Sequence, residues 1–135
     1  ILYAPVVEPY EITPQEKINI NGVELIPFTQ DHGLSTSLGF RIGDFGYSTD
    51  MINLDDAAIT TLKGVKTWVV DCANMYDERI FVHANLKRVL ELQEKIQAQQ
   101  LYLTHMKANL DYQTLCRELP AHIRPSFDGL RIPVT

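Results

Sequence analysis

The run Thr-Trp-Val-Val at residues 67–70 constrains the fold more than any other segment of the chain. It is β-branched and aromatic with no polar alternation, which is typical of a strand buried on both faces. The chain has 135 residues, of which 45% are hydrophobic and 21% are charged. This composition excludes a disordered or fibrous chain and leaves room for one core. We therefore expect residues 1–135 to form a single globular domain.

Further strand and turn signals surround this run. Residues 1–22 contain three prolines and no helical period, so we expect an extended arm and a strand there. The dipeptide Asn-Gly at residues 21–22 and the dipeptide Gly-Asp at residues 43–44 predict hairpin turns. The remaining expected strands cover residues 23–28, 38–42, 45–48, 101–103 and 127–134.

Three helices are expected, over residues 54–62, 84–97 and 112–118. The longest of them has a stripe of side chains on one face, formed by Leu86, Val89, Leu90, Gln93 and Ile96. On its outer side, Glu91 and Lys95 are spaced to pair across one turn. Strands that precede a strand-helix-strand-helix-strand pattern predict an α/β fold, with a mixed β-sheet and helices on one face.

Charge and cysteine content narrow the possible partners. The net charge is -5, and the twelve Lys and Arg residues are scattered, so a nucleic-acid partner is not expected. No apolar run is long enough to span a membrane, and residues 1–7 lack the pattern of a signal peptide. The cytoplasm is the expected compartment. There, Cys72 and Cys116 would be reduced thiols that fill the core.

Four polar residues each follow directly on an expected strand: His32, Asp50, Asp71 and His105. Loops at the carboxyl ends of strands usually build the sites of α/β sheets, and imidazole with carboxylate binds zinc, iron or manganese. The alternative is structural. In that interpretation the two histidines are turn residues, Asp50 caps the next helix, and His83 is a polar residue at a helix start. Asp71 is the weakest candidate.

The order of several motifs favours the first interpretation. They are Gly-Phe-Arg-Ile-Gly-Asp-Phe-Gly-Tyr-Ser-Thr-Asp ending at Asp50, Val-Val-Asp ending at Asp71, His83, Leu-Thr-His ending at His105, and Phe-Asp-Gly at residues 127–129. From His32 to the end of the chain, this order resembles the metallo-β-lactamase superfamily. The most similar branch contains phosphodiesterases related to the cyclic-phosphate hydrolase of phosphonate breakdown, and tRNA-3′-processing endonucleases are more distant.

The resemblance implies a role for each matching residue. His32 would complete a first metal site, Asp50 would bridge two ions, and His105 would be the last ligand of the second site. His83 would be the catalytic histidine that contacts the scissile phosphate, whereas Asp71 has no ligand role. The implied cofactors are two divalent metal ions, zinc or manganese. The implied activity is hydrolysis of a small phosphodiester by metal-activated water.

One departure limits this expectation. The superfamily's main motif, His-x-His-x-Asp-His, is absent, so the chain resembles the C-terminal half of a metallo-β-lactamase αββα sandwich. Metal binding by this chain alone should be weak or absent, and the chain alone should be inactive, because zinc held by protein usually has three or four ligands. A half sandwich would also leave one sheet face uncovered. We therefore expect a homodimer or association with the missing N-terminal half.

Two alternatives stay open at this point. The missing ligands are compatible with a non-catalytic interaction module that keeps only the scaffold. A relative of the tRNA-processing enzymes is the other alternative, but the segment between His32 and Asp50 has Arg41 as its only cation. This segment lacks a basic arm that would grip RNA.

Overall fold

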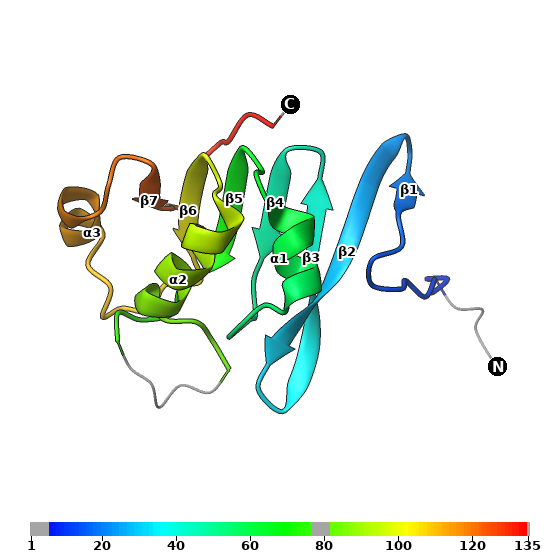
Figure 1. Cartoon of the computed structure of the whole chain (residues 1–135), viewed down its shortest axis with the longest axis horizontal. Helices are drawn as coiled ribbons and strands as arrows, with labels where there is room; N and C mark the ends of the chain where they lie inside the picture. The colour runs from blue at the N-terminus through cyan, green and yellow to red at the C-terminus, as the bar shows by residue number, and fades with distance from the viewer. Residues whose placement is uncertain (1–5, 77–81, 135) are drawn as a thin grey trace.

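The structure is a computed structural model that describes residues 6–76 and 82–134. Its strands form a seven-stranded sheet in sequence order, from β1 at one edge to β7 at the other (Figure 1). The strands are β1 (Ile18–Ile20), β2 (Val23–His32), β3 (Ser35–Ile42), β4 (Phe45–Ser48), β5 (Thr67–Asp71), β6 (Gln100–Thr104) and β7 (Ile123–Pro125). The helices are α1 (Asp56–Leu62), α2 (Leu86–Ile96) and α3 (Tyr112–Glu118). Neighbouring strands are antiparallel from β1 to β4 and parallel from β4 to β7.

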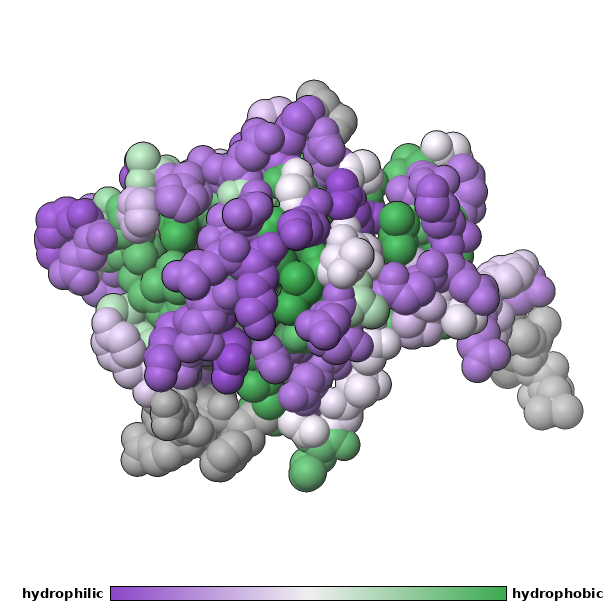
Figure 2. All heavy atoms as spheres, in the orientation of Figure 1, coloured by the Kyte–Doolittle hydropathy of each residue, from purple (hydrophilic) through white to green (hydrophobic). Residues whose placement is uncertain are grey.

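The three helices connect successive parallel strands. Crossovers of this kind are right-handed, and the strands follow one another in order, so the three helices cover the same face of the sheet. Figure 1 shows α1 and α2 in front of the sheet, and hydrophilic side chains form much of their outer surface in Figure 2. The expected α/β fold, with a mixed sheet and helices on one face, is therefore confirmed.

Helix α1 packs very close to the sheet because β4 carries a glycine beneath it. A Cβ atom at Gly46 would lie 2.4 Å from Leu62 Cδ2 and 3.2 Å from Trp68 Cδ1. Trp68 and Val70 are fully buried, and Val69 between them is 8% exposed. Strand β5 is thus buried on both faces, as its sequence predicts.

The face away from the helices carries a continuous row of side chains. Register pairs Phe40 with Tyr47, Tyr47 with Val69, and Val69 with Tyr102. Because paired residues point to the same side of a sheet, this row crosses four strands opposite Gly46 and Trp68. Tyr47 is 42% exposed in the row. We call these four residues the open-face row.

Several boundaries differ from the expected ones. Strand β2 extends to His32, and residues 35–37, which lie outside the expected strands, belong to β3. The hairpin continues because Gly33, with a φ of 74°, closes a tight turn after His32. No strand forms over residues 127–134; the last strand is β7, where buried Ile123 pairs with Leu101.

Helices α1 and α2 begin two residues later than predicted, whereas α3 has the predicted bounds. Asp55 is the N-cap of α1 and accepts a hydrogen bond from Ala58 N at 2.8 Å, so the structural interpretation of Asp50 as a cap is wrong. Helix α2 begins at Leu86 after the N-cap Asn85, and Leu92 is buried where Leu90 was expected. Glu91 forms an ion pair with Arg88 at 3.0 Å.

Two expectations concern the ends of the chain and membranes. Residues 1–5 of the expected arm lie outside the described residues, and the arm beyond them exposes Val6, Val7 and Tyr10. Across residues 6–76 and 82–134, no helix has the length and hydrophobicity that crossing a bilayer would need.

Candidate metal centre

The candidate residues gather at one edge of the sheet. Strands β2, β4, β5 and β6 run in the same direction, so their carboxyl ends share that edge. His32 is the last residue of β2, Asp50 lies two residues beyond β4, Asp71 ends β5, and His105 directly follows β6. His83 lies between β5 and α2, three residues before the helix begins. Polar residues far apart in the sequence are thus brought to the edge where α/β sheets build their sites.

Four of these residues form a compact cluster. One potential ligand atom from each of Asp50, Asp71, His83 and His105 lies within 4.8 Å of the others. Asp50 Oδ1 is 3.9 Å from His105 Nε2 and also 3.9 Å from His83 Nδ1. Two ligands that each lie about 2.0–2.2 Å from one ion are at most about 4.4 Å apart. Asp50 and His105 therefore have a separation that a single ion could bridge.

His32 lies beside this cluster and is not one of its four members. Its ring centroid is 5.3 Å from that of His83, and the His83 and His105 centroids are 4.3 Å apart. The His32 Nδ1 atom is 2.6 Å from the carbonyl oxygen of Val82, and only a protonated Nδ1 can donate to it. That hydrogen bond leaves Nε2 of His32 available as a ligand atom.

Asp71 is the residue that sequence reasoning undervalued. Its side chain is fully buried, and Oδ2 accepts a hydrogen bond from Met51 N at 3.1 Å. The same oxygen lies 2.7 Å from His83 Nδ1. Burial raises the pKa of the Asp71 carboxyl, and the hydrogen bond from His83 opposes this rise. The signal in the sequence was a carboxylate at the end of a doubly buried strand, which requires a partner.

Two candidate ligands have an unusual backbone conformation. Asp50 has a φ of 56° and His105 a φ of 60°, so both lie in the left-handed region that side chains other than glycine seldom adopt. Strain of this kind persists only where the surrounding structure enforces it, and it clusters at functional sites. Both residues lie at the sheet edge, where Asp50 Oδ1 is 3.9 Å from His105 Nε2.

The donor set fits a divalent metal ion. Two imidazoles and two carboxylates suit zinc, iron or manganese. Asp71 Oδ1 is buried and has no hydrogen-bond partner among the described residues, so this oxygen can interact with a cation or a proton. Because His83 Nδ1 and Asp71 Oδ2 are engaged with one another, Asp50, His105 and the neighbouring His32 are the residues that would hold an ion here.

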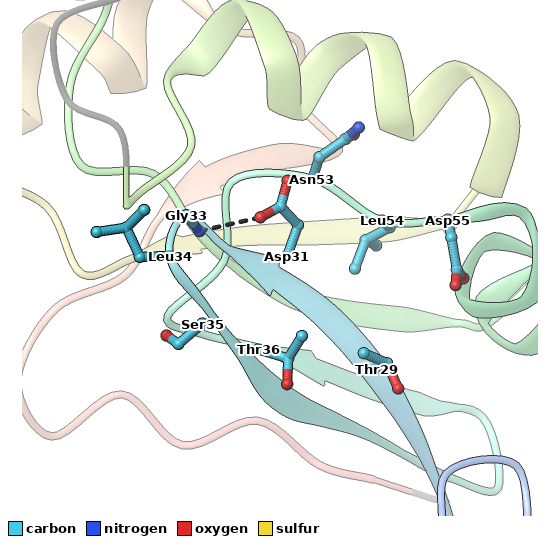
Figure 3. A pocket seen from close by; sticks show the side chains of 9 residues that line it. All are labelled: Thr29, Asp31, Gly33, Leu34, Ser35, Thr36, Asn53, Leu54 and Asp55. Atoms are coloured by element: carbon cyan, nitrogen blue, oxygen red, sulfur yellow. Dashed lines mark hydrogen bonds between the residues drawn. The ribbon is translucent and has the colours of Figure 1, made fainter.

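A separate cavity of about 610 Å³ lies beside the β2–β3 hairpin (Figure 3). It is lined by Thr29, Asp31, Gly33, Leu34, Ser35, Thr36, Asn53, Leu54 and Asp55. Asp31 Oδ1 accepts a hydrogen bond from Gly33 N at 2.9 Å, and Asp55 caps α1. Its two carboxylates thus have structural roles, and no imidazole lines it. The two imidazoles of the candidate centre, His83 and His105, lie instead at the carboxyl ends of the strands.

The chain is similar to a known protein family and to several solved structures. A family model described as "Beta-lactamase superfamily domain" matches residues 2–106. A solved structure described as a new diphosphatase from the PhnP family is 28% identical, with a TM-score of 0.84. The match covers 91% of this chain and 48% of that chain. None of the curated proteins matches the chain.

Two further solved structures share the fold. The metallo-beta-lactamase fold protein YhfI from Bacillus subtilis has a TM-score of 0.78 and 16% identity, over 96% of this chain and 57% of that chain. Zinc-bound PqqB from Methylobacterium extorquens has a TM-score of 0.69 and 12% identity, over 91% and 55%. The chain therefore spans about half the length of the solved structures that it matches.

Proposed function

Because the chain belongs to the beta-lactamase superfamily, we propose that it supplies one part of a metal-dependent hydrolase that cleaves phosphodiesters at a dinuclear centre. The observation that carries this proposal is the cluster of Asp50, Asp71, His83 and His105, whose potential ligand atoms lie within 4.8 Å of one another. Residues elsewhere in a longer protein would complete the ligand set, since the His-x-His-x-Asp-His motif is absent from these 135 residues.

In this proposal His32 and His105 would each hold one of the two ions, and Asp50 would be shared between them. Zinc or manganese ions, when bound, supply Lewis acidity that activates water and neutralises charge on the phosphate. The part played by this chain is to hold the ligands in place before substrate arrives. The left-handed backbone of Asp50 and of His105 fits that part, because it is enforced by the fold.

His83 has the surroundings of a proton donor. Its Nδ1 lies 2.7 Å from Oδ2 of the buried Asp71 carboxylate, and this contact fixes the orientation of the ring. Nε2 is therefore the ring atom that can exchange a proton with a substrate. His83 Nε2 would protonate the leaving oxygen, and Asp71 would stabilise the charged imidazole. The side chain of His83 is 15% exposed, so a substrate oxygen can reach it without full access of water.

A phosphoryl substrate is supported by the relative at 28% identity, which is described as a diphosphatase. The order of motifs around Asp50, His83 and His105 favours a phosphodiester within that class. The open-face row of Phe40, Tyr47, Val69 and Tyr102 belongs to the same proposal. It would be covered by the remainder of a longer protein or by a second copy of the chain.

The test is hydrolysis of a chromogenic phosphodiester by the full-length gene product, loaded with manganese or zinc. Asp50→Ala should abolish turnover and weaken metal binding in calorimetry, whereas Glu118→Ala, which removes an exposed carboxylate at the end of α3, should leave both unchanged. Unchanged turnover in Asp50→Ala would contradict the proposed dinuclear centre. Cleavage of diphosphates but not of phosphodiesters would show that the substrate is a diphosphate, as the description of the similar diphosphatase suggests.

A further inference from the structure

We infer that Gln30 and Ser37 are positioning residues that hold the backbone of Asp50 in its left-handed conformation. The inference rests on the proposed function, in which the Asp50 carboxylate is a metal ligand. Neither residue touches the candidate ligand atoms of the centre. Both act on the main chain of Asp50, where two consecutive carbonyl groups receive side-chain hydrogen bonds.

Gln30 is an unusual residue for its place in the core. It is fully buried in β2, two residues after fully buried Phe28. Burying an amide is costly unless its hydrogen bonds are made. Its Nε2 donates to Thr49 O at 2.8 Å and to Ser37 Oγ at 2.9 Å, which uses both N–H groups, whereas Oε1 has no hydrogen-bond partner among the described residues. Because a carbonyl can only accept, Nε2 and not Oε1 must face Thr49.

Ser37 continues this chain of hydrogen bonds. It is the β3 residue that pairs with Gln30 in the sheet register. Its hydroxyl accepts from Gln30 Nε2 and donates its single proton to Asp50 O at 2.6 Å. The direction of every hydrogen bond is therefore fixed, from the amide through the hydroxyl to the main chain.

The two carbonyl groups belong to the peptides on either side of the Asp50 Cα atom. Gln30 holds the peptide before it and Ser37 the peptide after it, so together they restrain both φ and ψ of Asp50. The second peptide is also held from its other side, where Met51 N donates to Asp71 Oδ2 at 3.1 Å. The left-handed region is unfavourable for residues other than glycine, and without these contacts Asp50 would relax to a commoner conformation. That change would turn Asp50 Oδ1 away from His105 Nε2.

The test compares Ser37→Ala and Gln30→Met with two controls in the full-length gene product. Ser37→Thr keeps the hydroxyl. Ser126→Ala removes a hydroxyl of matched geometry, since half-buried Ser126 Oγ donates to Leu103 O at the same 2.6 Å. The first measurement is the ¹³C chemical shift of Asp50 in protein free of metal. The second is zinc affinity by calorimetry.

Ser37→Ala and Gln30→Met should move the Asp50 shifts toward extended values and weaken zinc binding about 10- to 100-fold, as losses in the outer shell of a metal site do. Ser37→Thr and Ser126→Ala should keep the wild-type shifts and affinity. Unchanged Asp50 shifts in Ser37→Ala would overturn the inference, and so would changed shifts with unchanged zinc affinity. If the wild-type protein itself binds no zinc, the proposed function fails, while the shifts still decide whether the pair holds Asp50.

Discussion

Gly39 is the position at which the sheet beneath the candidate centre is most sensitive to added volume. It pairs with Phe28 across β2 and β3. A Cβ atom there would lie 2.3 Å from Phe28 Cε2, 2.4 Å from Phe28 Cζ and 2.6 Å from Gln30 Oε1. Phe28 and Gln30 are fully buried, so neither can swing into solvent. We predict that Gly39→Ala forces these two side chains apart and destabilises the protein.

The size of the effect follows from two opposing contributions. Overpacking of a tight core costs about 1–3 kcal/mol, and three contacts this short place Gly39→Ala in the upper part of that range. Alanine restricts the unfolded chain and returns about 0.5–1 kcal/mol. The expected loss in unfolding free energy is therefore about 2 kcal/mol. With an unfolding entropy of about 2.1 cal/mol/K per residue over 135 residues, the Tm should fall by about 7 °C.

Thermal and urea unfolding measure this loss, with exposed Thr36→Ala on the same strand as the control. Phe28→Leu in the same chain as Gly39→Ala should make room for the new methyl group, so the double variant should lose less than the sum of the single losses. Equal melting of Gly39→Ala and wild type would refute the close packing of Gly39. Strict additivity in the double variant would show that Phe28 is not the side chain that is displaced.

The remaining predictions concern other regions. His83→Ala should lower turnover of the metal-loaded full-length protein by about 10²–10⁴-fold, as loss of a general acid does. The control His122→Ala, which removes an exposed histidine, should leave turnover unchanged. Equal activities of the two variants would show that His83 has no part in the mechanism. Cys72 is fully buried and its pKa is raised to about 12, so a thiol reagent should label half-buried Cys116 first in native protein; prompt labelling of Cys72 would contradict its burial. Sedimentation equilibrium of the 135-residue chain should detect a dimer that Tyr47→Asp weakens, and a wild-type monomer at micromolar concentration would argue against coverage by a second copy.

Local sequence signals predict most strands of the sheet because the signals are strong and packing against neighbouring strands favours the same conformation. Residues 45–48 form β4 with the predicted bounds, and the Asn21–Gly22 turn has the positive φ angles, 52° and 88°, that its sequence favours. The full length of the β2–β3 hairpin was harder to predict, since residues 35–37 are polar and carry no hydrophobic alternation. Their strand conformation comes from cross-strand pairing with β2, which is a tertiary effect.

The site illustrates the same limit. His32, Asp50 and His105 could be predicted as neighbours because each comes at the end of a strand. The sequence shows only that Asp71 ends a doubly buried strand and therefore needs a partner, and the fold is required to identify that partner as His83. The same holds for Gln30, which looks like an ordinary polar residue near a turn until its burial is known.

Asp71 connects the two halves of the proposed chemistry. Its Oδ2 accepts from Met51 N, in the peptide that follows Asp50, and lies 2.7 Å from His83 Nδ1. One buried carboxylate therefore restrains both a candidate ligand and the candidate proton donor.

Asp71→Asn would keep an acceptor for Met51 but replace the charged partner of His83 with a neutral one. Hydrogen bonds to charged groups contribute about 1.5–3 kcal/mol and neutral ones about 0.5–1.5 kcal/mol, so the difference is about 1–1.5 kcal/mol, or roughly tenfold in rate. Asp71→Asn should thus slow turnover more than it weakens zinc binding, whereas Ser37→Ala should weaken zinc binding first. The opposite order in the two variants would show that Asp71 serves the metal site and not His83.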